Sequence, residues 1–278
     1  MASLVTVEER GTRQIHTAGA IIIGDEVLSG KTVDTNSAYF ARWCFSLGIN
    51  LKRIEVIADD ESEIIEASRR MSENYDFVVT SGAKAFGLEL TLHEESLARM
   101  KRLSVPHRSQ PNFSWDTPSP SLTAKLRMVH LPIDTTRCEE GQILFVDDKL
   151  WVPIVVINGN VHILPGIPQL FEQLLQGLKP VLLPRLADPD GRGTHMILFS
   201  TPLGESVVAP YLTELAAKVE SKGIKVGSYP RWGKKTNTVT LVGKDGDYME
   251  SLVSEIEKSV QGLRIKAEGE DDSDNGEA

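Results

Sequence analysis

Short apolar runs alternate with amphipathic segments throughout residues 18–80, and this alternation constrains the fold most. The run at 18–25 is apolar and closes at Gly24, which is typical of a strand buried on both faces of a parallel sheet. Helical spacing of apolar residues follows from Asn36 and stops at Gly48. A second strand, a second helix and a third strand are expected at residues 51–58, 59–74 and 75–80. This order predicts an α/β fold with a doubly wound, mainly parallel sheet.

The rest of the sequence indicates a second, smaller domain. A stretch rich in Pro, Gly and Asp at 184–193 precedes a new series of strands and helices, which is typical of an α+β domain. Within the first domain we expect residues 83–100 to be helical or part-helical and residues 126–132 to form a strand. The predicted parts are a polar leader at 1–17, an α/β domain at 18–183 with a surface excursion at 106–120, an α+β domain at 194–266, and an acidic disordered tail at 267–278.

Charge and composition argue against several classes of partner. The net charge is −9, but the tail holds six acidic residues and no base, so the remainder is only mildly acidic. Bases and aromatic residues are not arrayed for nucleic acid, and the cluster at 229–235 is expected to be a loop packed by Trp232. No apolar stretch is long enough to span a membrane. We therefore expect neither a nucleic-acid nor a membrane partner, and a homo-oligomer stays open.

The leader and the cysteines bear on location and metal content. Residues 1–17 lack the apolar core of a signal peptide, which favours a cytoplasmic protein. Cys44 and Cys138 show no metal-ligand spacing, so we expect neither a disulfide framework nor a zinc site.

The most informative chemistry follows the first strand. Asp25 and Glu26 are carboxylates that could hold a divalent metal such as Mg²⁺ and serve as catalytic residues. Asp34 and Asn36 could bind hydroxyl or amide groups of a ligand. Gly24 and Gly30 have no side chain, so they would let the backbone approach that ligand. On spacing alone, a second interpretation is equally good: Asp25 and Glu26 are turn residues, and Asp34 begins a helix cap.

Two further segments are candidates for the same site. Ser81 and Gly82 end the third strand, and ligands in doubly wound sheets bind at the carboxyl ends of strands. Pro165, Gly166 and Pro168 connect a strand to a helix and could form a second wall of a binding site. The alternative for this second segment is an ordinary turn with proline at a favoured position.

These motifs together resemble a known family. The pattern Gly-Asp-Glu-Val-Leu-Ser-Gly at 24–30, followed by Asp-Thr-Asn at 34–36, is similar to the opening motif of the MoaB/Mog molybdopterin-binding fold. The closest version is that of CinA-like proteins and of the N-terminal domain of eukaryotic FAD synthases, in particular the fungal stand-alone members. Segments at 59–60, 76–82, 158–168 and 227–230 are similar to family members in the same order, so the resemblance covers residues 17–265.

The resemblance implies a phosphate-bearing small-molecule ligand, either molybdopterin or a dinucleotide diphosphate such as FAD or ADP-ribose. It implies metal-dependent hydrolysis of that diphosphate, with Asp25 and Glu26 as metal ligands. Gly24, Gly30, Asp34, Asn36, Ser81, Gly82, Pro165, Gly166 and Pro168 would surround the ligand. One alternative is a non-catalytic binding module for molybdopterin or a nucleotide. Another is FMN adenylyltransferase activity by analogy with the FAD synthases, although those enzymes carry the transferase on a separate domain.

One segment departs from the family pattern. Family members continue after Thr-Ser-Gly with a glycine-rich run of the type Gly-Ile-Gly-Pro-Thr-x-Asp-Asp, whose N–H groups would cradle phosphate. This chain continues from Gly82 directly into Ala-Lys-Ala-Phe-Gly at 83–87. We therefore expect a deletion on the order of a dozen residues after Gly82, with residues 83–87 displaced. A mis-assigned or alternative exon and a natural pseudoenzyme would both explain it.

Overall fold

The structure is a computed structural model that describes residues 5–82, 88–104, 113–189, 193–268 and 270. The chain forms two compact units, Met1–Gly191 and Arg192–Ala278. Each unit has its own buried cluster of apolar side chains, and each is described by itself. Among the described residues, no helix is both long and apolar enough to span a bilayer.

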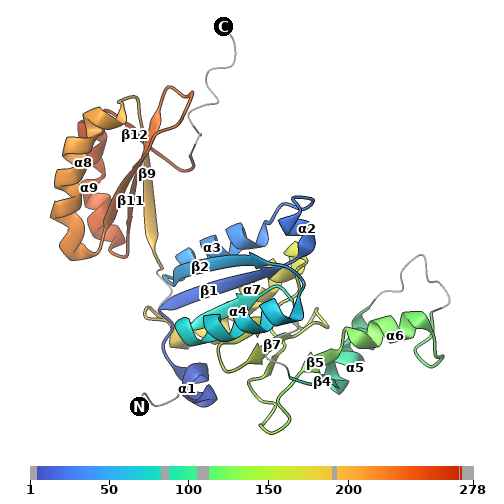
Figure 1. Cartoon of the computed structure of the whole chain (residues 1–278). Helices are drawn as coiled ribbons and strands as arrows, with labels where there is room; N and C mark the ends of the chain where they lie inside the picture. Colours follow the sequence, from blue (N-terminus) through green and yellow to red (C-terminus); the bar gives the residue numbers. More distant parts are fainter. Residues whose placement is uncertain (1–4, 83–87, 105–112, 190–192, 269, 271–278) are drawn as a thin grey trace. The chain divides into compact units, whose positions relative to one another are not determined.

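The first unit is built on a six-stranded sheet (Figure 1). Its strands in chain order are β1 (Thr17–Ile23), β2 (Asn50–Ile57), β3 (Phe77–Thr80), β6 (Ile143–Leu144), β7 (Ile154–Ile157) and β8 (Val161–Ile163). The spatial order is β2-β1-β3-β8-β7-β6. The first four of these run parallel, whereas β7 and β6 add an antiparallel edge. The predicted doubly wound, mainly parallel sheet is confirmed.

Three helices cover the two faces of this sheet, as Figure 1 shows: α3 (Asn36–Ser46), α4 (Glu61–Asn74) and α7 (Pro168–Leu182). Phe40 of α3 and Phe171 of α7 lie in one buried cluster with Phe77. Ala67 and Met71 of α4 lie in a separate cluster on the other face. The sheet is therefore closed to water by apolar helix faces on both sides, which leaves the strand ends as the places where polar groups meet.

The leader is more than a polar tail. It contains helix α1 (Val7–Thr12), and Ile15 after it is buried and pairs with Leu186. Gly159 explains the close packing, because a Cβ on this residue, at φ +76°, would come within 2.2 Å of the carbonyl oxygen of Val7. The polar composition concealed this contact, since only one buried apolar side chain anchors the segment.

One local expectation holds in part and another was wrong. Residues 83–100 were expected to be helical or part-helical, and within the described residues a short strand β4 (Leu90–Leu92) comes first, so that α5 (Glu94–Leu103) begins only after His93, which caps it. Residues 126–132 divide between the end of α6 (Pro120–Arg127) and β5 (His130–Pro132), because the Ser119 side chain and Pro120 start a helix there. A short helix α2 (Asp25–Leu28) follows β1, and η1 (Leu183–Arg185) follows α7. The expected displacement of residues 83–87 lies outside the described residues, as does most of the tail.

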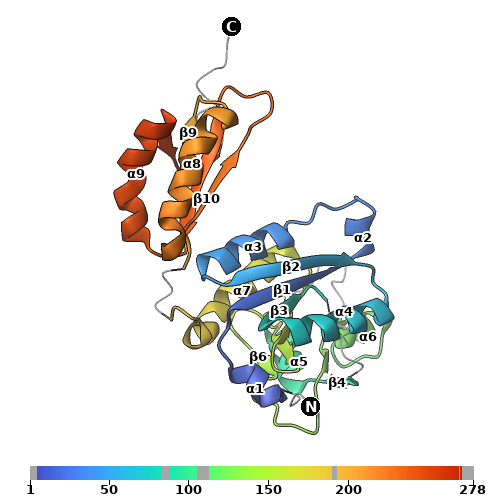
Figure 2. The ribbon, with the colours of Figure 1, turned by 60° about the vertical axis from the view of Figure 1, so that its left-hand side comes forward.

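The second unit is a four-stranded antiparallel sheet with two helices. In Figure 2 the helices lie together on one side of the sheet. Its elements are β9 (His195–Thr201), α8 (Glu205–Val219), η2 (Glu220–Lys222), β10 (Lys225–Tyr229), β11 (Asn237–Gly243), α9 (Gly246–Val260) and β12 (Leu263–Ile265). The strand order is β10-β11-β9-β12. Ile197, Phe199, Val239 and Leu241 point toward α8 and α9 and form its core. The expectation that Trp232 packs a loop was wrong, because this side chain is fully exposed.

Candidate functional site

A cavity of about 380 Å³ lies at the carboxyl ends of β1 and β3. Ile22 and Ile23 of β1 line it, together with Ser81, which directly follows β3. The chain leaves β1 toward β2 on one side and returns to β3 on the other, so this is the point where the strand order reverses. Doubly wound sheets bind their ligands at such a point.

Helix α2 turns the two carboxylates of the opening motif in different directions. Both Asp25 and Glu26 are exposed, but only Glu26 lines the cavity. Gly24 precedes the helix in extended backbone and donates its N–H to the carbonyl oxygen of Ile57 at 3.1 Å. Gly30 ends this turn at φ +73° outside the cavity lining, so its role is to allow left-handed backbone.

Asp34 and Asn36 reach the cavity from the start of α3. The Asp34 carboxylate accepts hydrogen bonds from the N–H and the hydroxyl of Ser37, so it caps the helix as well as lining the cavity. The Asn36 amide donates from Nδ2 to the carbonyl oxygen of Gly166 at 2.9 Å. Its Oδ1 has no hydrogen-bond partner, although the side chain is only 6% exposed.

The remaining predicted residues divide between the wall of the cavity and its support. Ser81 accepts the N–H of Ile23 at 3.0 Å through its hydroxyl and so ties the ends of β3 and β1 together. Gly166 and Pro168 line the cavity at the start of α7. Gly82 and Pro165 do not line it.

The electrostatics of the cavity combine two helix N-termini with hydrogen-bond acceptors. The N-cap side chains Thr35 of α3 and Ile167 of α7 make no capping hydrogen bond, and both residues line the cavity. The positive ends of two helix dipoles therefore face it. None of its described lining residues is Lys, Arg or His. Glu26, Asp34 and the Oδ1 of Asn36 supply acceptors instead.

The expected metal finds no cage in the described part of the chain. No group of three or more His, Cys, Asp or Glu side chains there is arranged to hold a metal ion. Of the expected metal ligands Asp25 and Glu26, only the second faces the cavity. Within the described residues, this donor set does not fit a metal held by protein alone.

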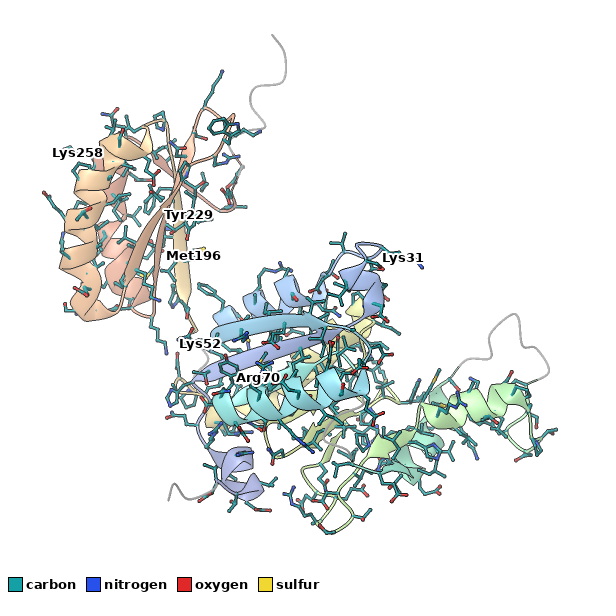
Figure 3. The ribbon with its side chains drawn as sticks, in the orientation of Figure 1. Lys31, Lys52, Arg70, Met196, Tyr229 and Lys258 are labelled. Atoms are coloured by element: carbon teal, nitrogen blue, oxygen red, sulfur yellow. The ribbon has the colours of Figure 1, made fainter. Side chains whose placement is uncertain are left out.

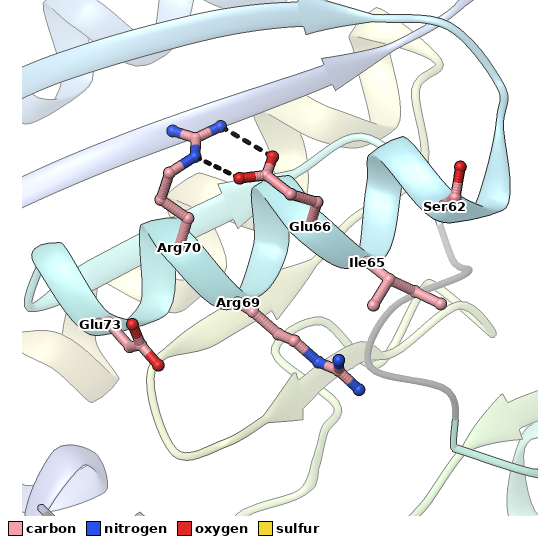
Figure 4. A pocket seen from close by; sticks show the side chains of 6 residues that line it. All are labelled: Ser62, Ile65, Glu66, Arg69, Arg70 and Glu73. Atoms are coloured by element: carbon pink, nitrogen blue, oxygen red, sulfur yellow. Dashed lines mark hydrogen bonds and ion pairs between the residues drawn. The ribbon is translucent and has the colours of Figure 1, made fainter.

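A second surface hollow shows the opposite character (Figure 4). It lies along α4, where Arg70 binds Glu66 at 2.7 Å and Glu55 of β2 at 2.8 Å. Hydrogen bonding to Arg70 lowers the pKa of Glu55, and burial opposes this only in part. The charges of Arg70, Glu66 and Glu55 satisfy one another, and the other two charged lining residues, Arg69 and Glu73, are exposed to water. The described lining of this hollow therefore has no buried unpaired atom that calls for a ligand as Asn36 does.

Comparison with known proteins assigns both units. Residues 19–187 match the family described as probable molybdopterin binding domain, which is more than half of the chain. The chain belongs to this family. Residues 195–268 match a second family, the FAD synthase middle domain.

This member of the molybdopterin-binding family is also similar to individual proteins. A probable FAD synthase of Caenorhabditis elegans is 28% identical over 270 residues, which cover 90% of this chain and 51% of that protein. A protein of Pyrobaculum arsenaticum is 30% identical over 266 residues, covering 85% of this chain and 94% of the relative. The chain thus spans about half the length of the FAD synthase relatives. The crystal structure of CinA from Thermoplasma acidophilum is 26% identical and covers 60% of this chain and 98% of that one, with a TM-score of 0.46.

Sequence reasoning missed the apolar part of the cavity wall. Val33 and Ile167 line the cavity and remain 83% and 59% exposed. Large apolar side chains at the rim of a cavity are a sign of an apolar ligand surface. Val33 lies between Lys31 and Asp34 in a polar loop. An isolated apolar residue in such a loop was the only sequence feature that could have indicated a contact with a ligand.

Proposed function

We propose that the cavity at the ends of β1 and β3 binds a nucleotide or a pterin that carries phosphate. The observation that carries this proposal is the orphaned Oδ1 of buried Asn36 on the cavity wall. Leaving a buried acceptor unpaired costs about 1–3 kcal/mol, so such an atom calls for a donor from elsewhere. Among the described residues four side chains have a buried polar atom without a hydrogen bond, of which Arg13 still forms an ion pair with Asp76, and only Asn36 lines this cavity.

The chemistry of the wall suits the parts of such a ligand. A hydroxyl or amino group would donate to Oδ1 of Asn36, and further donors would meet Glu26 and Asp34. The uncapped N-terminus of α7 is complementary to phosphate, because its first N–H groups and its dipole favour an anion. Val33 and Ile167 offer apolar surface to a flat ring. The similarity to the molybdopterin-binding family and the FAD synthase middle domain supports both ligand classes.

A second candidate is hydrolysis of a dinucleotide diphosphate such as FAD or ADP-ribose. Glu26 and Asp34 both line the cavity and favour this candidate, because carboxylates beside a bound diphosphate can orient an attacking water. The described residues provide no group of three or more metal-ligating side chains, so this candidate rests on the carboxylates alone. FMN adenylyltransferase activity is a third candidate by analogy with the FAD synthase relatives alone, of which this chain spans about half.

Binding can be tested with a pair of variants that make the same chemical change. Val33→Glu places a carboxylate on the cavity wall, whereas Leu28→Glu places one at an exposed apolar residue outside that wall. With FAD and ADP-ribose as probes in isothermal titration, Val33→Glu should weaken binding about tenfold or more by charge repulsion, and Leu28→Glu about twofold or less. Failure of both probes to bind at millimolar concentration, or equal losses in the two variants, would overturn the proposal.

Turnover requires a separate assay. Incubation of the full chain with FAD or ADP-ribose and Mg²⁺, followed by detection of released FMN or AMP, measures hydrolysis. A variant with a glycine-rich Gly-x-Gly-Pro loop inserted after Gly82 tests whether the departure from the family pattern limits activity. We expect binding in both chains and faster hydrolysis in the loop-restored chain. Binding without turnover in either chain would leave the binding module as the function and reject the hydrolase.

A further inference from the structure

The second unit separates its charges between its two layers. Residues 224–244, which contain the β10–β11 hairpin, include five Lys or Arg and no Asp or Glu. Helices α8 and α9 together carry six acidic residues and two lysines. A positive field therefore arises on the sheet side of the unit and a negative one on the helix side.

One face of the sheet turns away from the helices. Side chains alternate along each strand, and Val239 and Leu241 of β11 face α8 and α9. Thr238, Thr240 and Val242 therefore face the other way. The register places Tyr229 beside Thr238 and Met196 beside Val242 on this second face. Figure 3 shows Tyr229 and Met196 on the sheet side and Lys258 on the helix side.

Tyr229 forms a flat platform on that face. A Cβ on Gly227 would lie 3.3 Å from Cε2 and 3.5 Å from the hydroxyl oxygen of Tyr229, so the ring rests over the glycine. The tyrosine is nevertheless 57% exposed. One side of the ring is thus supported by backbone, and the ring presents open surface to solvent.

The hairpin turn adds a second aromatic side chain, which lies among lysines and an arginine in the sequence. Trp232 is completely exposed, although burial of a tryptophan is strongly favourable. Lys234 and Lys235 follow it and are exposed, and Arg231 precedes it. Gly233 adopts φ +74°, which lets the chain turn directly after the tryptophan. An exposed tryptophan beside cationic side chains is a suitable stacking partner for a nucleobase, because the cations can bind the phosphate of the same nucleotide.

This surface already attracts an anionic group. Glu268, the first acidic residue of the tail, lies with its carboxylate 3.8 Å from Arg231 and 3.5 Å from the hydroxyl of Thr238. Five more acidic residues and no Lys or Arg follow Glu268 in the sequence. The tail is therefore a polyanion joined to the basic layer.

We propose that the surface formed by Tyr229, Trp232, Lys234, Lys235, Lys225 and Arg231 binds single-stranded nucleic acid in competition with the acidic tail. Bases stack on the two aromatic rings, and phosphates lie against the cations. A single strand fits better than a duplex, because only unpaired bases expose their faces for stacking. A strand also fits better than one nucleotide, because the four lysines and arginines beyond the aromatic pair offer charge for several successive phosphates.

Fluorescence anisotropy with a labelled oligouridylate and the full chain tests the proposal. Trp232→Ala should weaken binding about tenfold, which is the loss of one stacked base. Lys235→Glu should weaken it about fivefold or more, whereas Lys258→Glu, the same charge change on α9, should alter it less than about twofold. Equal losses for the two lysines would show non-specific attraction and overturn the proposal.

Salt and the tail provide independent readouts. Four cations in contact with a single strand predict a slope of roughly −3 for the logarithm of affinity against that of salt, or roughly 50-fold weaker binding from 50 to 200 mM salt. Removal of residues 268–278 should strengthen binding. Inorganic polyphosphate is the probe without bases. If it binds as tightly as the oligonucleotide and ignores Trp232→Ala, or if the oligonucleotide fails to bind at 50 mM salt, the proposal is wrong.

Discussion

Two buried asparagines at opposite ends of the six-stranded sheet differ in how their hydrogen bonds are satisfied. At the amino end, Asn160 donates from Nδ2 to the carbonyl oxygens of Ser72 and Tyr75, each at 2.8 Å, and accepts the Ser72 hydroxyl at 2.6 Å. At the carboxyl end, Asn36 makes a single bond to Gly166, and its Oδ1 stays unpaired. Both asparagines are buried, but the hydrogen bonds of the side chain are complete at one end and incomplete at the other.

Carboxylates show the same contrast. Asp76 at the amino end accepts the N–H groups of His16 and Thr17 and the Thr17 hydroxyl, and it lies 3.2 Å from Arg13. Burial alone would raise the pKa of Asp76, but these bonds and the nearby charge lower it overall. Glu26 at the carboxyl end is exposed on a cavity. Polar residues of the family-like segments thus divide into those that stabilise the fold and those left for a ligand.

The largest expected effect is the loss of stability in Asn160→Ala. This change removes the amide donor from the carbonyl groups of Ser72 and Tyr75 and the acceptor of the Ser72 hydroxyl, although Tyr75 keeps a bond from Arg13 and the Ser72 hydroxyl keeps one from Asn158. It should lower the free energy of unfolding of the first unit by about 3 kcal/mol. Urea unfolding followed by tryptophan fluorescence in a Trp232→Phe background measures the first unit alone, because the other three tryptophans belong to it.

Asn74→Ala is the matched control for that experiment. Asn74 is exposed and bonds only the carbonyl oxygen of Arg70 within α4, so its removal should cost less than about 1 kcal/mol. If Asn160→Ala lowers the free energy of unfolding no more than Asn74→Ala does, then the hydrogen bonds at the amino end of the sheet do not stabilise the fold as we infer.

His162, also near the amino end, makes stability depend on pH. Burial lowers the pKa of this imidazole to about 3, with a smaller contribution from the charge of Arg185. The unfolded chain binds a proton below about pH 6.5 and the folded chain does not, so stability falls as the pH falls. Between pH 7 and pH 5 the loss should be about 2 kcal/mol, measured by urea unfolding of the first unit.

His162→Phe keeps a ring against Phe77, whose centroid lies 4.7 Å from that of His162, and removes the titrating group. Its stability should change by less than about 1 kcal/mol over the same pH range. The same pH-dependent loss in wild type and variant would show that other groups cause it.

The sequence predicted the fold well and the site only in part, for reasons that these residues illustrate. Apolar periodicity is a local signal, so the strands and helices around Ile21 and Phe40 could be predicted from short windows. Whether Asn160 or Asn36 keeps a free acceptor depends on Ser72 and Gly166, which lie far away in sequence. Likewise, the choice between Asp25 and Glu26 depends on the orientation of the short helix α2. Trp232 was misjudged because composition does not record exposure.

Asn36→Ala should affect ligand binding more than stability, in contrast to Asn160→Ala. It removes the bond to Gly166 but also an unpaired acceptor, so stability should change by less than about 1 kcal/mol. Binding of FAD or ADP-ribose, measured by titration calorimetry, should weaken about fivefold to tenfold because a ligand donor loses its partner. A variant with unchanged affinity and a stability loss near that of Asn160→Ala would make Asn36 a structural residue.

The smallest effects separate the two adjacent carboxylates of α2. Glu26→Gln and Asp25→Asn each remove one charge from an exposed side chain, so each should change stability by less than about 0.5 kcal/mol. Only Glu26 lines the cavity, so only Glu26→Gln should alter ligand affinity, by about twofold to fivefold, and it should strengthen binding of an anionic ligand when no divalent cation is present. Titration of ADP-ribose with and without Mg²⁺ measures this difference. An equal response of both variants would mean that the ligand senses the summed charge of α2 and not the orientation of Glu26, and the distinction between the two carboxylates would then fail.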